Sequence, residues 1–180
     1  DVMHWGPGYY NNLALNQFSL PFNSMSVDLQ VGPLTVVSVY GDLRIYKGNV
    51  NEGNKEARNL YGHRYELNFG DLIIGMSELQ VVYDDNDVWL FVPIVPLFME
   101  KGNYTESSNN GALSFDLNYR LFNMARIYTE FFMDDFQSPA ELIKNEDVQS
   151  KWAWMVGAQM GHDFAWKSHT LELGTLAEYA

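Results

Sequence analysis

The sequence predicts an all-β fold of long antiparallel strands, and three observations indicate it. Apolar and polar residues alternate along much of the 180-residue chain, which is the period of a strand with one apolar and one polar face. The strand-like stretches run to about ten residues, whereas five or six is usual in soluble domains. Short turns alternate with long polar loops. We treat residues 1–180 as a single β-segment without a second domain.

Eight stretches have the composition and alternation of strands. They cover residues 24–31, 34–44, 58–69, 71–83, 112–121, 124–134, 152–163 and 169–179, with NNLALNQF at 11–18 as a weaker ninth candidate. The short connections lie at Val31–Pro33, Gly70–Asp71, Phe122–Asn123 and Phe164–Ser168, and the long loops at 45–57, 84–111 and 135–151. In the last loop, Ser138 can cap a helix that Pro139 opens, which predicts a short helix at 139–148.

The two faces of these strands differ in chemistry. One face is apolar, with Val27 and Leu29, then Tyr61, Tyr65 and Leu67, then Leu113, Phe115 and Leu117, then Ile127 and Phe131, then Trp152, Trp154 and Val156. The other face carries charges of both signs, at Asp28, Arg64, Glu66, Asp116, Arg120, Arg126 and Glu130. Buried charges are tolerated when they are paired. These residues therefore predict a charge network lining the lumen of a barrel, with the solvated face of a soluble sheet as the alternative.

Strand length and loop asymmetry favour a barrel that crosses a membrane. About ten residues are enough to cross a bilayer at a tilt, and outer-membrane barrels combine short periplasmic turns with long extracellular loops. Tyr and Trp suit the membrane interface, and aromatic residues make up 15% of this chain. The sequence has no apolar run of about 20 residues, which excludes a transmembrane helix. The net charge of −12 argues against a nucleic-acid partner.

Four stretches carry a resemblance to a known family. They are HWGPGYYNNLALNQ (His4–Gln17), LYGHRYELNF (Leu60–Phe69), GMSELQVVY (Gly75–Tyr83) and EFFMDDFQ (Glu130–Gln137). Together they resemble the Wzi-type capsule-assembly family of bacterial outer-membrane β-barrels. The resemblance implies a large, non-enzymatic barrel in contact with outer-membrane lipid, whose outer surface helps to hold capsular or exopolysaccharide on the cell.

The number of strands departs from that family. Eight or nine strands are about half of such a barrel, so we expect this chain to be a fragment of it. If the short turns are periplasmic, strand 169–179 ends at the cell surface, whereas a complete bacterial barrel keeps both ends in the periplasm. An independent eight-stranded barrel is the alternative.

The longest loop contains the residues that we expect to contact polysaccharide. Asp84, Asp85 and Asp87 offer oxygen ligands, but they lack the EF-hand pattern, so we predict a solvated acidic loop and no metal site. Trp89 could stack on a sugar face. The apolar stretch Val88–Met99 contains two prolines, which argues against a central strand. It either packs at the barrel mouth or forms the ordered base of the loop.

Enzymatic chemistry has little support in the sequence. The chain has no cysteine, its four histidines show no metal spacing, and no Gly-x-Ser-x-Gly elbow is present. We therefore predict no cofactor and no catalysis. Two other classes stay open, which are a porin-like transport barrel and a soluble β-barrel that binds a small apolar ligand. Solute conductance would favour the first of these, and solubility without detergent the second.

Overall fold

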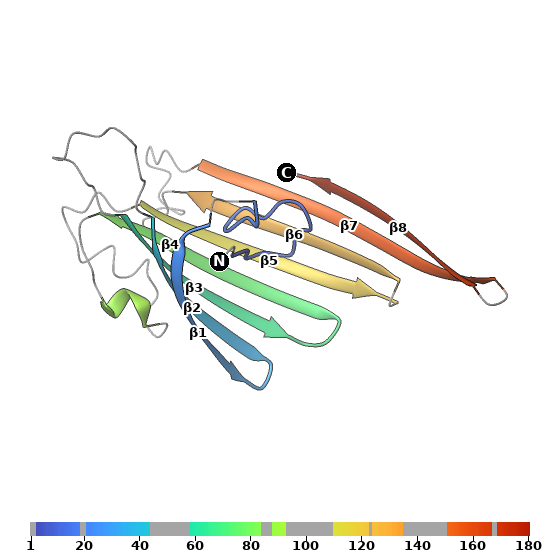
Figure 1. Cartoon of the computed structure of the whole chain (residues 1–180), viewed down its shortest axis with the longest axis horizontal. Coiled ribbons are helices and arrows are strands. Elements are labelled where there is room, and N and C mark those ends of the chain that lie inside the picture. The colour runs from blue at the N-terminus through green and yellow to red at the C-terminus, as the bar shows by residue number, and fades with distance from the viewer. Residues whose placement is uncertain are drawn as a thin grey trace, which may run out of the picture.

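The computed structural model describes residues 3–18, 21–43, 58–83, 88–92, 110–122, 124–134, 151–166 and 169–180. Its strands form one antiparallel sheet in which each strand pairs with its neighbours along the chain, in the order β1 to β8 (Figure 1). This confirms the all-β antiparallel class. β1 and β8 are the edges of the sheet, which is open rather than closed into a barrel in the described part of the chain.

The strand boundaries agree closely with the alternation in the sequence. The elements are β1 (Asn23–Val31), β2 (Leu34–Asp42), β3 (Arg58–Asn68), β4 (Leu72–Tyr83), the 3₁₀ helix η1 (Val88–Phe91), β5 (Asn110–Leu121), β6 (Ala125–Asp134), β7 (Lys151–Trp166) and β8 (His169–Tyr179). All eight predicted strands are present. The predicted helix at 139–148 and most of the long loops lie outside the described residues.

The tight turns are confirmed at three of the four predicted places. Gly32 and Gly70 adopt φ angles of 59° and 85°, which glycine tolerates because it has no Cβ atom, and Phe122 adopts 51°. The fourth prediction, a turn over Phe164–Ser168, is wrong in extent. β7 continues its pairing with β8 as far as Trp166 opposite His169. The aromatic residues in this stretch favour strands, which explains why the ladder continues.

The predicted ninth strand at 11–18 is wrong. Within residues 3–18, which we call the N-terminal segment, the one strand-like pairing is an isolated bridge between Trp5 and Leu15. The backbone N–H groups of Leu13 and Ala14 donate to the side chain of Glu130 instead of to a neighbouring strand. The segment therefore lies across one face of the sheet, in front of β5 and β6 in Figure 1, rather than extending the sheet at its edge.

The register separates the sheet into the two predicted faces. The polar face carries Ser26 and Asp28, Arg64 and Glu66, Ser77, Asp116, Arg126 and Glu130, and Glu178. The apolar face carries Leu29, Leu67, Ile74, Phe115, Ile127, Trp154 and Val156, all of them exposed. Val31 and Trp152 on this face are 75% and 69% exposed. The sheet thus exposes its apolar side and covers its charged side.

The apolar face is buried toward the long loops. Leu90 of η1 packs with Tyr61 and Val82, and Leu113 packs with Met133. The first part of Val88–Met99 therefore packs on the apolar face of β2 and β3. The prediction that placed this stretch at the barrel mouth or the loop base did not anticipate this contact, because alternation within a strand says nothing about what covers it.

Candidate functional site

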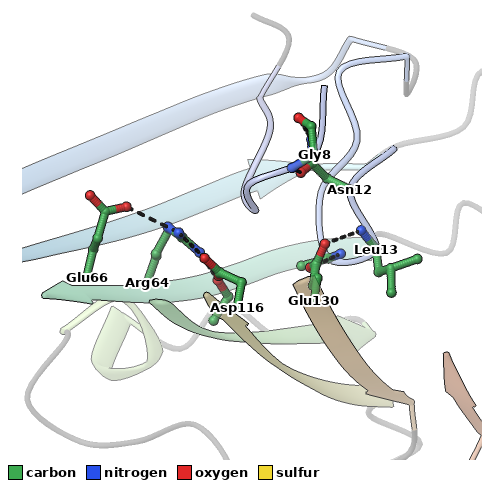
Figure 2. Close-up of polar contacts among 9 residues, drawn as sticks. Gly8, Asn12, Leu13, Arg64, Glu66, Asp116 and Glu130 are labelled. Atoms are coloured by element: carbon green, nitrogen blue, oxygen red, sulfur yellow. Dashed lines mark hydrogen bonds and ion pairs between the residues drawn. The ribbon is translucent and has the colours of Figure 1, made fainter. Parts of the chain in front are cut away.

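Arg64 on β3 and Asp116 on β5 form the central ion pair of the polar face (Figure 2). Two parallel hydrogen bonds join them, from Nη1 to Oδ2 over 2.6 Å and from Nη2 to Oδ1 over 3.0 Å. Arg64 also donates to Ser77 Oγ at 2.9 Å and to Glu66 Oε2 at 3.2 Å. Since Arg64 is only 8% exposed, these partners provide the pairing that a buried guanidinium requires.

Gly75 allows this ion pair to form across the intervening strand β4. It is the register partner of Glu66 on one side and of Asp116 on the other. A Cβ atom at position 75 would collide with the carboxylate of Asp116 and the guanidinium of Arg64. The missing side chain on β4 therefore gives Arg64 the room to reach a carboxylate two strands away.

Glu130 on β6 connects the charged cluster to the N-terminal segment (Figure 2). Its side chain lies opposite Asp116 in the register and is fully buried. The carboxylate accepts hydrogen bonds from the backbone N–H groups of Leu13 at 2.8 Å and Ala14 at 3.1 Å. Because each oxygen of the side chain accepts one backbone N–H group, Glu130 fixes the second half of the segment on the sheet.

Glu178 on β8 holds the first half of the N-terminal segment in the same way. Its carboxylate accepts hydrogen bonds from the backbone N–H groups of Tyr9 at 2.9 Å and Asn11 at 2.6 Å. The hydroxyl of Tyr128 on β6 donates to the same carboxylate at 2.6 Å. Two carboxylates from different strands therefore anchor the segment through its backbone.

Trp5 packs the N-terminal segment against the middle of the sheet. Its buried indole lies over Gly62, where a Cβ atom would come within 2.8 Å of the ring and 2.9 Å of the Leu79 side chain. Arg126 donates a hydrogen bond to the carbonyl of Pro7 nearby. The segment thus combines one aromatic anchor with polar contacts to the charged face.

Gly62→Ala is expected to loosen the N-terminal segment while leaving the sheet intact. The added methyl group cannot fit beneath the indole of Trp5, so the ring has to move away from the sheet. Chymotrypsin should then cut at Tyr9 or Tyr10 faster than in the original protein. Gly174→Ala is the matched control, because a Cβ atom there meets only a backbone oxygen at 3.8 Å. Equal cutting of both variants would contradict the packing role of Trp5.

The predicted charge network is only partly brought together. Arg64, Glu66, Asp116 and Glu130 are neighbours on the polar face, as predicted. Three other predicted members lie on this face outside the cluster, with Arg126 contacting the N-terminal segment and Asp28 and Arg120 exposed. Glu178 was missed, although its alternate position in β8 could have indicated that it faces the charged side.

The predicted polysaccharide contacts are not placed by the structure. Asp84, Asp85 and Asp87 lie outside the described residues. Trp89 belongs to η1, but its side chain also lies outside the description. These four residues stay predictions from the sequence.

A second polar cluster lies on the otherwise apolar face, and the sequence did not indicate it. His63 Nδ1 and Glu78 Oε1 are 3.2 Å apart, and the hydroxyl of Tyr65 lies 3.3 Å from the same carboxylate oxygen. Ser38 and Gln80 are buried beside them. These residues are far apart in the sequence, so only the register of β2, β3 and β4 brings them together.

Comparison with protein-family models, curated proteins and solved structures found no match to this chain. Within the described ranges, no helix is both long and apolar enough to span a membrane. In the same part of the chain, no three histidine or carboxylate side chains gather in a way that could hold a metal ion.

Proposed function

We propose that this chain forms part of an outer-membrane β-barrel that helps to assemble or attach capsular or exopolysaccharide at the bacterial cell surface. The observation that carries the membrane part is the distribution of side chains between the faces. Apolar residues such as Leu29, Phe115 and Trp154 are exposed, while the Arg64–Asp116 ion pair is buried. A soluble sheet would bury its apolar face, whereas a membrane barrel directs it to lipid and keeps polar groups inside.

The cover on the polar face favours attachment over transport. Trp5, Leu13 and Ala14 of the N-terminal segment lie against side chains that would face the lumen. A barrel whose lumen is occupied in this way is poorly suited to passing solutes. The assignment of polysaccharide as the partner rests on the resemblance to the Wzi-type family. We expect the long loops, which lie at the end of the sheet opposite the tight turns, to contact it.

The proposal is tested in source cells that lack the gene and are complemented with the full-length protein. We expect the original protein to enter the outer membrane, to migrate differently in boiled and unboiled gel samples, and to restore cell-bound polysaccharide. A variant lacking residues 84–110 should still enter the membrane but release the polysaccharide into the medium.

Each part of the proposal has its own contradicting outcome. Recovery of the original protein in the soluble fraction would overturn the membrane assignment. Unchanged cell-bound polysaccharide after gene removal would overturn the attachment role, and full retention by the deletion variant would overturn the loop assignment. Solute conductance by the original protein in planar bilayers would favour the transport barrel instead.

A further inference from the structure

Three polar side chains form a row across the apolar face of the sheet. Ser38 on β2 lies directly opposite His63 on β3, and His63 lies directly opposite Glu78 on β4. All three are buried, at 0%, 0% and 2% exposure. A serine, a histidine and a carboxylate in this order are the groups of a nucleophile, a general base and the residue that orients the base.

His63 is oriented in the way that such a relay requires. Its Nδ1 atom faces Glu78 Oε1 at 3.2 Å, so in the neutral ring Nδ1 carries the proton and Nε2 is left as the acceptor. Nε2 is buried, and it has no hydrogen-bond partner among the described residues. Buried polar atoms in proteins are nearly always paired, so this ring nitrogen is an acceptor that the described residues leave available.

Ser38 is the register neighbour of His63 on β2, but its hydroxyl is engaged by η1, which covers the row. Directly opposite residues in an antiparallel pair have Cβ atoms about 4.5–5.5 Å apart, which leaves little space between a serine hydroxyl and the imidazole. In the structure the Ser38 hydroxyl donates instead to the backbone carbonyl of Phe91, the last residue of η1. Leu90 packs beside it on Tyr61 and Val82. The row is thus covered by η1.

We propose that Ser38, His63 and Glu78 form a catalytic relay that hydrolyses carboxylic esters of membrane lipids. Ser38 is the nucleophile, His63 is the general base, and Glu78 is a positioning residue that acts through His63.

The chemistry balances without a cofactor. Ser38 Oγ attacks the ester carbonyl carbon while its proton moves to His63 Nε2, and negative charge develops on the carbonyl oxygen. The bond from this carbon to the alcohol oxygen then breaks, and the alcohol takes the proton from His63. Water, deprotonated by the same nitrogen, cleaves the acyl–serine bond. One ester and one water thus give one fatty acid and one alcohol.

The apolar side chains around the row favour a lipid substrate. Toward the short turns, the same face of the sheet exposes Val31 of β1, Leu67 of β3 and Ile74 of β4. Toward the long loops, η1 covers it. A lipid chain lying along the exposed apolar side chains would bring its ester to the edge of this cover. The choice of a lipid rests on the proposed membrane location, whereas the relay itself does not.

The test uses the full-length protein in detergent micelles with an alkyl fluorophosphonate. This reagent phosphonylates the hydroxyl oxygen of an activated serine, with fluoride as the leaving group. We expect mass spectrometry to find the adduct on Ser38. Leu90→Ala should raise the labelling rate by loosening η1, and Ser26→Ala on β1 should label like the original protein. The proposal is overturned if neither the original protein nor Leu90→Ala carries an adduct at Ser38.

Further variants separate catalysis from folding. His63→Gln should slow labelling by about 100-fold or more, the usual contribution of a general base. Glu78→Gln should slow it as well, and Glu78→Asp should restore part of the rate, which a purely structural role would not predict. Fatty-acid release from phosphatidylcholine vesicles is expected from the original protein and not from Ser38→Ala. Labelling at Ser38 without such release would overturn the lipid substrate, and neither result depends on whether the protein holds polysaccharide.

Discussion

Asp116→Ala is expected to lower the free energy of unfolding by about 3 kcal/mol, because it leaves the guanidinium of Arg64 buried without its main partner. The loss of one member of a buried ion pair costs about 3–5 kcal/mol in general. Glu66 remains 3.2 Å from Arg64 and is partly exposed, so it compensates some of this loss and places the effect at the lower end. Urea unfolding of the refolded chain in detergent micelles measures the change.

A double variant distinguishes the effect of losing the charges from the effect of losing side-chain volume. Arg64→Met with Asp116→Leu removes both charges and keeps apolar volume, so it should be more stable than Asp116→Ala alone. Arg120→Met is the control, since Arg120 lies on the same face but is exposed, and its effect should stay within about 0.5 kcal/mol. A double variant as unstable as the sum of its two single changes would contradict a direct interaction between Arg64 and Asp116.

The strands and the faces could be predicted from the sequence because a period of two is a local property. Arg64 and Asp116 each occupy an alternate position in their own strands, so the pattern alone placed both on the charged side. Asp28 and Arg120 share that side for the same reason, yet they are exposed. Alternation determines the face of a side chain but not how deeply it is covered.

The contacts that depend on long-range pairing could not be predicted. Glu130 accepts hydrogen bonds from backbone N–H groups, which every residue except proline has. No side-chain pattern in residues 11–18 could therefore indicate that these N–H groups would bind Glu130 instead of pairing in a strand. The row of Ser38, His63 and Glu78 depends on the register of three strands. Alternation within β3 places His63 on the apolar side with Tyr61 and Tyr65, where a polar cluster is not expected.

The second large effect is expected at Glu130, where Glu130→Gln should release part of the N-terminal segment. The amide offers one oxygen in place of two, and its NH₂ group would face a backbone N–H that also needs an acceptor. The change leaves the backbone N–H of Leu13 or of Ala14 without an acceptor, which costs about 1–3 kcal/mol and loosens the anchoring of these residues. Chymotrypsin cutting after Leu13 should become faster, while the rate in Glu66→Gln should stay near that of the original protein.

A conductance measurement tests whether the N-terminal segment closes the lumen of the proposed barrel. Glu178 holds Tyr9 and Asn11 independently, so Glu130→Gln with Glu178→Gln is needed to free both halves of the segment. In planar bilayers, we expect the full-length double variant to pass ions through the lumen of the proposed barrel and the original protein to pass none. Conductance in the variant alone would mean that the segment occupies the lumen, as an attachment barrel allows. Equal conductance in both proteins would mean that the segment closes nothing, and the transport barrel would then be the better explanation of the charged face.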